Sequence, residues 1–130
     1  MGFISGVDFV MVPVGDYDEA KRFYGDVLEL ELSKPYGQHP GGEFETGTLT
    51  LQVMDPSGFG LGQFQPNTNP VALHVEDFDG AKEKLEERGV EFMHAMDSGV
   101  CHMGFFKDPW GNTYCLHHRY APPEARPAGI

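Results

Sequence analysis

The segment that decides the fold spans residues 107–118, KDPWGNTYCLHH. Within it, residues 108–112 place turn-forming residues side by side, because proline presets φ and glycine or asparagine accepts a left-handed backbone. One β-prone segment precedes this corner at residues 100–106, and another follows it at residues 113–118. The pattern predicts an antiparallel hairpin, and we expect its second strand to help line any binding site.

Outward from this hairpin, the chain repeats one pattern at an offset of 61 residues. The first copy runs strand, helix, strand, strand, strand, and its predicted elements cover residues 7–14, 17–28, 30–32, 43–46 and 48–54. The second copy begins with a strand at 70–75, a helix to about residue 88 and a strand at 90–94, and it ends in the hairpin. Five pairs of positions are identical at this offset: Val14 and Val75, Asp16 and Asp77, Asp18 and Asp79, Ala20 and Ala81, Lys21 and Lys82. Two such units, each too small to stand alone, are expected to pack their sheets together.

The side-chain alternation assigns faces to two strands of the first copy. Apolar residues occupy both sides of the strand at 7–14, with Val10, Val12 and Val14 on one side and Phe9, Met11 and Pro13 on the other. This predicts a strand covered on both faces. In the strand at 48–54, Thr50 and Gln52 share the face opposite the apolar residues.

We expect a single domain over residues 1–130, built from a first module at 7–54 and a second at 70–118. Residues 55–69, DPSGFGLGQFQPNTN, have the composition of a linker or a lid. Residues 119–130 contain three prolines and are expected to form a tail outside the core.

The charge balance limits the classes of partner. The net charge is −11, with nine Lys and Arg against twenty Asp and Glu, so nucleic acid and anionic membranes are disfavoured and a cationic or neutral small ligand is favoured. No apolar run approaches the roughly 20 residues that span a bilayer, and the first residues do not have the pattern of a signal peptide. Two cysteines, Cys101 and Cys115, make no disulfide framework. We expect a reduced, cytoplasmic protein.

The tandem βαβββ pattern, with residues 23–25 (FYG) in the first helix and residues 108–112 (DPWGN) at the last corner, resembles the vicinal oxygen chelate superfamily. That group includes glyoxalase I, extradiol dioxygenases and the bleomycin and fosfomycin resistance proteins. The resemblance covers about residues 7–118. It implies an α+β fold in which the modules form a curved eight-stranded sheet, or cup, with helices outside and a divalent metal inside. It also implies a homodimer.

Counting from the shared motifs transfers the four usual metal positions of that superfamily onto Phe9, Gln52, Pro70 and Cys115. Phe and Pro cannot ligate a metal, Gln is a weak neutral ligand, and Cys is a soft ligand that needs thiolate character. The usual metal site is therefore expected to be absent or rebuilt. This counts against glyoxalase and ring-cleaving dioxygenase activities, which use the metal to stabilise an enolate-like charge.

Three histidines are the candidate catalytic residues. Strand alternation places His74 and His117 on the cup side, whereas the doublet at 105–106 leaves the side of His102 open. One hypothesis is that His74 and His117, with His102 or Glu45, form a displaced divalent-metal site or an acid–base pair. The alternative is that they are strand histidines satisfied by hydrogen bonds at the rim. The candidate ligand-binding residues are Phe9, Met11, Thr50, Gln52, Cys115 and Glu45.

Three functions remain open from the sequence. The first is a glyoxalase-like lyase or isomerase, or a dioxygenase, that uses a rebuilt metal site or a metal-free histidine pair. The second is a non-catalytic protein that binds and sequesters a cationic or aromatic small molecule such as an antibiotic. The third is a sensor or partner-binding module, which would have a filled cup.

Overall fold

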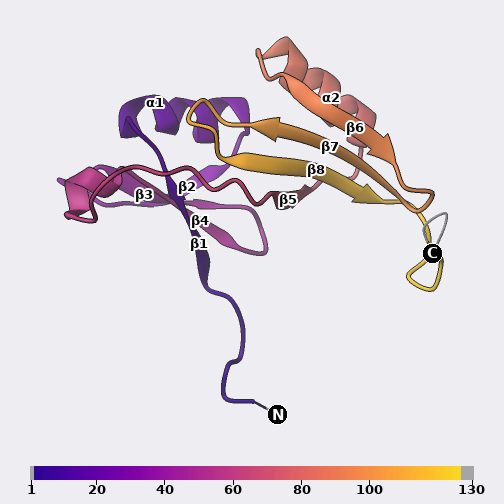
Figure 1. Cartoon of the computed structure of the whole chain (residues 1–130), viewed down its shortest axis with the longest axis horizontal. Helices are drawn as coiled ribbons and strands as arrows, with labels where there is room; N and C mark the ends of the chain where they lie inside the picture. The colour runs from indigo at the N-terminus through magenta and orange to yellow at the C-terminus, as the bar shows by residue number, and fades with distance from the viewer. Residues whose placement is uncertain (1, 127–130) are drawn as a thin grey trace. The chain divides into compact units, whose positions relative to one another are not determined.

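The computed structural model describes residues 2–126 and divides into two compact units, Met1–Pro66 and Asn67–Ile130 (Figure 1). Each unit contains one four-stranded mixed sheet and one α-helix, in the order strand, helix, strand, strand, strand. The α+β class and the tandem βαβββ modules predicted from the sequence are confirmed. Among the described residues, no helix is long and apolar enough to cross a membrane.

In the first unit, the first and the last strand in the sequence lie next to each other in the sheet. Its elements are β1 (Phe9–Pro13), α1 (Tyr17–Arg22), η1 (Phe23–Val27), β2 (Glu31–Pro35), β3 (Gly41–Glu45), β4 (Thr50–Met54) and η2 (Pro56–Phe59). The strand order is β1-β4-β3-β2, in which β1 runs parallel to β4 and the other neighbours are antiparallel. Asp16 caps α1, because its carboxylate accepts a hydrogen bond from the Glu19 backbone N–H at 3.2 Å. The helix continues as the single π-helical turn η1, which buries Tyr24 completely against Phe44.

Only one face of β1 is buried, so the predicted covering of both faces is wrong. Val12 is 1% exposed, whereas Phe9 and Met11 on the other face are 48% and 45% exposed. The reason is that α1 and η1 supply apolar side chains such as Ala20 and Tyr24 to one side of the sheet alone. The opposite side of the first sheet therefore carries exposed apolar side chains.

The hairpin of β2 and β3 is longer than its composition indicates. β2 extends to Pro35 and β3 starts at Gly41, so the connection left between the predicted strands at 30–32 and 43–46 contributes residues to both strands. Backbone pairing does not require apolar alternation, and Tyr36 donates its N–H to the Gly41 carbonyl at 3.0 Å. A register shift between Leu32 and Lys34 bends this edge of the sheet.

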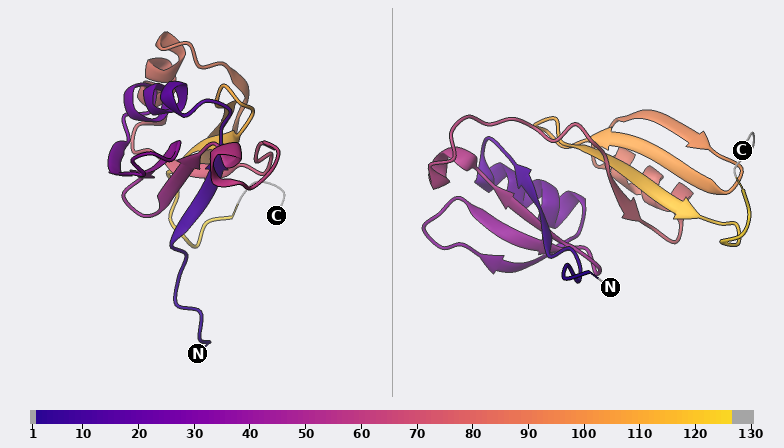
Figure 2. Two further views of the ribbon diagram at one scale, coloured as in Figure 1. Left: turned by 90° about the vertical axis from the view of Figure 1, so that its left-hand side faces the viewer. Right: turned by 60° about the horizontal axis from the view of Figure 1, so that its bottom comes forward.

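The second unit repeats the topology of the first. Its elements are β5 (Val71–His74), α2 (Phe78–Glu87), β6 (Phe92–Asp97), β7 (Cys101–Lys107) and β8 (Thr113–Arg119). The strand order is β5-β8-β7-β6, with β5 parallel to β8 (Figure 2). The hairpin predicted around residues 108–112 is present as the antiparallel pair of β7 and β8.

Side-chain hydrogen bonds hold the corner between β7 and β8. Asp108 is 4% exposed, and its carboxylate accepts from the Trp110 and Asn112 backbone N–H groups at 2.9 and 2.8 Å. Its other oxygen accepts from the Asn112 side-chain amide at 2.7 Å. The side-chain oxygen of Asn112, Oδ1, accepts a hydrogen bond from the Asn67 backbone N–H at 2.8 Å. The corner therefore also fixes the segment that leads into β5.

The chain after β8 folds back onto its own unit. The Arg119 guanidinium donates to the carbonyls of Pro122 and Ala125 at 2.8 and 3.0 Å. The Tyr120 and Ala121 backbone N–H groups donate to the Val100 carbonyl. Residues 127–130 of the predicted tail lie outside the described residues.

Candidate functional site

The first unit contains an open pocket of about 550 Å³ beside the exposed face of its sheet. Pockets of this size accept small organic molecules. The β2–β3 hairpin, β4 and η2 contribute the lining residues that carry charge, hydrogen-bonding groups or rings: Lys34, Tyr36, His39, Glu43, Gln52 and Phe59.

A short hydrogen-bond chain forms the polar part of this pocket. The Gln52 amide donates from Nε2 to Tyr36 Oη at 3.0 Å, and Tyr36 Oη donates to Glu43 Oε2 at 2.7 Å. Burial, followed by the bond to Glu43, raises the pKa of Tyr36, so the phenol stays protonated and acts as the donor. Gln52 Oε1 is buried and has no hydrogen-bond partner among the described residues. Such an orphan acceptor costs free energy in the folded state.

Aromatic rings form the wall of the pocket. Phe59 stacks on His39 with 5.2 Å between ring centroids and meets Tyr36 edge-on at 6.1 Å. The turn that carries Phe59 is fixed, because Asp55 caps it through the Ser57 N–H at 3.0 Å and donates its own N–H to the Pro40 carbonyl at 2.9 Å. The wall is therefore set by local structure within the first unit.

Five of the predicted ligand-binding residues share one face of the first sheet. Phe9 and Met11 on β1 are in register with Thr50 and Gln52 on β4, and Glu45 on β3 is in register with Thr50. Glu45 accepts from Ser33 Oγ at 2.5 Å and from Thr50 Oγ1 at 2.7 Å, and these bonds lower its pKa in that order. Only Gln52 of these five lines the pocket.

His74 and His117 are adjacent in the second unit. They are register partners on the parallel strands β5 and β8, so their side chains share one face of the second sheet. His74 Nε2 lies 2.9 Å from Glu76 Oε1, and its ring centroid lies 6.1 Å from that of His118. The pKa of His117 is lowered, mainly because burial disfavours the charged ring and then because His74 is close. Sequence alternation alone did not single out Glu76 or His118.

His102 lies apart from that pair, on the side of the second sheet that faces α2. Phe106, four residues further along β7, is fully buried, whereas Phe105 faces the other side and stacks on His94. The His102 ring stacks on Phe78 of α2 with 5.5 Å between centroids. His102 and Phe106 therefore lie on the side of the sheet that faces α2, and Phe105 lies on the other side. His102 thus forms no common site with His74 and His117 in the described structure.

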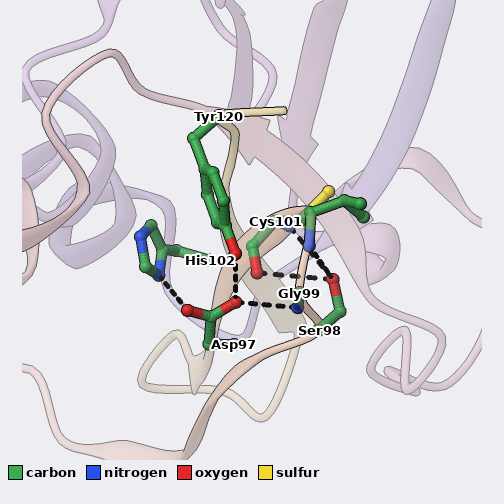
Figure 3. Close-up of polar contacts among 7 residues, drawn as sticks. Asp97, Ser98, Gly99, Cys101, His102 and Tyr120 are labelled. Atoms are coloured by element: carbon green, nitrogen blue, oxygen red, sulfur yellow. Dashed lines mark hydrogen bonds and ion pairs between the residues drawn. The ribbon is translucent and has the colours of Figure 1, made fainter. Parts of the chain in front are cut away.

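The contacts of His102 belong to the turn between β6 and β7 (Figure 3). Its ring centroid lies 4.8 Å from that of Tyr120, and its Nδ1 lies 3.8 Å from Asp97 Oδ2. Tyr120 Oη and the Gly99 N–H both donate to Asp97 Oδ1, at 2.7 and 2.8 Å. This network connects the chain after β8 to the turn between β6 and β7, which is a structural role.

The family comparison decides the identity of the fold. The model of the Glyoxalase/Bleomycin resistance protein/Dioxygenase superfamily matches residues 6–116. The chain belongs to this superfamily. The resemblance recognised in the tandem βαβββ pattern and in the DPWGN corner is therefore confirmed.

Members of the superfamily that resemble this chain include both enzymes and binding proteins. The probable lactoylglutathione lyase of Synechocystis sp. is 26% identical over 113 residues, which is 78% of this chain and 86% of that protein. The crystal structure of TnmS3, an antibiotic binding protein from Streptomyces sp. CB03234, is 25% identical with a TM-score of 0.72, and covers 92% of this chain and 99% of that chain. A superfamily member from Sphaerobacter thermophilus is also 25% identical, with a TM-score of 0.74 and coverage of 88% and 97%.

The residues at the usual metal positions of the superfamily do not fit a divalent metal. The side chains of Phe9 and Pro70 have no metal-ligating atom, and Gln52 offers only a weak, neutral amide oxygen. Cys115 is 2% exposed, and burial raises the pKa of its thiol, which opposes the thiolate form that binds metals. Within residues 2–126, no group of three or more His, Cys, Asp or Glu side chains is arranged to hold a metal, at these positions or at the displaced site considered for His74 and His117.

Proposed function

We propose that this superfamily member binds a small aromatic molecule in the pocket of its first unit, without a metal at the usual superfamily position. The observation that carries the proposal is Gln52. It occupies one of those positions, yet its amide donates to Tyr36 and its carbonyl oxygen is buried without a partner. Buried polar groups in native proteins are satisfied with few exceptions, and a donor group of a bound ligand would supply the partner that Gln52 Oε1 lacks among the described residues.

The rest of the pocket supports an aromatic ligand that carries a polar group. Phe59, His39 and Tyr36 present rings on which a planar molecule can stack. Glu43 Oε1 has no hydrogen-bond partner among the described residues, so it can accept from an N–H or O–H of the ligand. Sequestration of such a molecule agrees with the similarity of the chain to TnmS3, which is an antibiotic binding protein.

Exchanging Gln52 for methionine separates a binding role from a structural one. The change removes the buried orphan acceptor at the cost of one hydrogen bond to Tyr36 Oη, which still donates to Glu43. We expect the free energy of unfolding to rise by about 1 kcal/mol, and the affinity for tryptamine, used as an aromatic probe, to fall about tenfold. Urea unfolding and isothermal titration calorimetry measure the two effects.

The matched control is Thr50→Val, which alters the same face of β4 outside the pocket and should leave tryptamine binding unchanged. Binding of tryptamine in EDTA should equal binding in the presence of Zn²⁺ or Ni²⁺. A Gln52→Met variant that is less stable and binds the probe normally would show that Gln52 has only a structural role. Binding that requires a divalent metal would contradict the metal-independent proposal.

A second candidate function is acid–base catalysis by His74 and His117 in a lyase reaction, since the Synechocystis relative is named a probable lactoylglutathione lyase. The observation that favours it is their placement on one face of adjacent strands with a lowered pKa for His117. A lowered pKa keeps the imidazole neutral near pH 7, which is the form that accepts a proton.

Replacing His117 by glutamine tests this candidate through stability and turnover. The folded chain disfavours the protonated ring, so the pKa of His117 is lower in the folded state than its ordinary value of 6.5. Its contribution to the free energy of unfolding is complete above pH 6.5, where the ring is neutral in both states. That contribution is lost as the pH falls through the folded-state pKa. The variant should therefore lose less stability than the wild type on acidification from about pH 7 to pH 5. Lactoylglutathione formation by the wild type that disappears in His117→Gln supports catalysis, and its absence in the wild type contradicts it.

A further inference from the structure

Lys34 and Glu43 carry opposite charges at directly paired positions of the β2–β3 hairpin. Opposite charges across two strands ordinarily interact with each other. Here no ion pair joins them within the described residues, and Glu43 Oε2 accepts a hydrogen bond from Tyr36 Oη at 2.7 Å. Among the described residues Lys34 forms no ion pair at all, although both side chains line the same pocket.

The pocket therefore presents a positive and a negative group that its own structure leaves available. Tyr36 occupies one oxygen of the Glu43 carboxylate and leaves Oε1 without a partner in the described chain. The exposed Lys34 side chain leaves its ammonium group accessible. A ligand with one charge would gain from one of these groups and be repelled by the other.

We propose that the pocket selects aromatic zwitterions, whose acidic group binds the Lys34 ammonium and whose protonated amine binds Glu43 Oε1 while the ring packs on Phe59. This rests on the proposed binding function and narrows its ligand class. Charge-assisted hydrogen bonds to both ends would supply the selectivity, since they are stronger than neutral ones and fail when either charge is missing. A ligand that is only cationic, as the overall charge of the chain suggests, is disfavoured by Lys34.

Three probes with the same indole ring test the proposal: L-tryptophan as the zwitterion, tryptamine as the cation and indole-3-propionate as the anion. Calorimetry at pH 7 should give L-tryptophan about a tenfold higher affinity than either singly charged probe. Lys34→Gln should remove the advantage over tryptamine, and Glu43→Gln should remove the advantage over indole-3-propionate. Lys107→Gln, an exposed lysine of the second unit, changes the net charge equally and should preserve the order.

The outcomes separate this inference from the function on which it rests. Equal affinities for the three probes, lowered together by Gln52→Met, would overturn zwitterion selection and keep the binding function. Tightest binding of tryptamine, strengthened by Lys34→Gln, would also overturn it and identify a cation site. No binding of any probe, or binding that none of the Gln52, Lys34 and Glu43 variants changes, would contradict both proposals. Unfolding curves of the Lys34 and Glu43 variants should match the wild type, because Gln at position 43 can still accept from Tyr36.

Discussion

Replacing Asp108 by alanine is expected to lower the free energy of unfolding by about 4 kcal/mol, because the buried carboxylate accepts three hydrogen bonds at one corner. The loss leaves the Trp110 and Asn112 backbone N–H groups and the Asn112 side-chain amide without this acceptor. It also loosens Asn112, whose carbonyl oxygen holds the Asn67 N–H at 2.8 Å. Urea unfolding followed by the fluorescence of Trp110, the single tryptophan, reports directly on this corner.

The control for Asp108 is the exposed cap at Asp55, which accepts from the Ser57 backbone N–H at 3.0 Å and from its hydroxyl at 2.7 Å. Removing an exposed cap costs about 1 kcal/mol. Asp55→Ala should therefore be much milder than Asp108→Ala. Equal losses for the two variants would mean that burial of the Asp108 carboxylate adds nothing to the stability of the corner.

Replacing Gly42 by alanine is expected to cost about 2–3 kcal/mol, because no room exists for a side chain on that side of β3. A methyl group there would overlap Tyr17 Oη and lie 2.8 Å from Leu32 Cδ1. The neighbouring Lys34 carbonyl oxygen, at 3.3 Å, prevents the group from moving aside. Chemical denaturation of the purified variant gives the loss directly.

Gly25→Ala is the matched control for Gly42. Its added methyl group would lie 3.8 Å from Phe44 Cε1, which is an ordinary contact, and alanine favours helical backbone over glycine by about 1 kcal/mol. We expect this variant to be as stable as the wild type or more so. If Gly42→Ala behaved like Gly25→Ala, the close approach of Tyr17 to β3 would not hold in solution.

The repeat and the corner were predictable because short runs of residues specify each of them. Residues 108–112 concentrate turn formers, and the pairs at offset 61, such as Asp16 and Asp77, mark the same helix start twice. The exposed face of β1 was not predictable, because Phe9 and Met11 are as apolar as a core pair. Strand alternation reports which residues share a face, and the partner that covers a face comes from elsewhere in the chain.

The pocket of the first unit was the feature that could least be predicted from the sequence. Gln52 was singled out only as a weak ligand at a metal position, whereas the structure gives it a donor role toward Tyr36 and an orphan carbonyl. Tyr36 and His39 fell in a predicted connection without assigned roles, and the contact of Phe59 with both depends on the turn at η2. Contacts between a hairpin and a distant turn have no periodic signature. The separation of His102 from His117 required the strand register, which the doublet at 105–106 concealed.

The pairing of the first strand of each unit with its last has a consequence for synthesis on the ribosome. Within its own sheet of the described chain, β1 pairs with β4 alone, and β5 pairs with β8 alone. The first sheet therefore cannot close until residue 54 has left the exit tunnel, and the second sheet cannot close until β8 has left it. Non-local pairings of this kind fold slowly, and incomplete sheets expose edges on which nascent chains aggregate. A stop codon that removes β8 would thus release a complete first unit attached to a second whose opening strand has nothing to pair with.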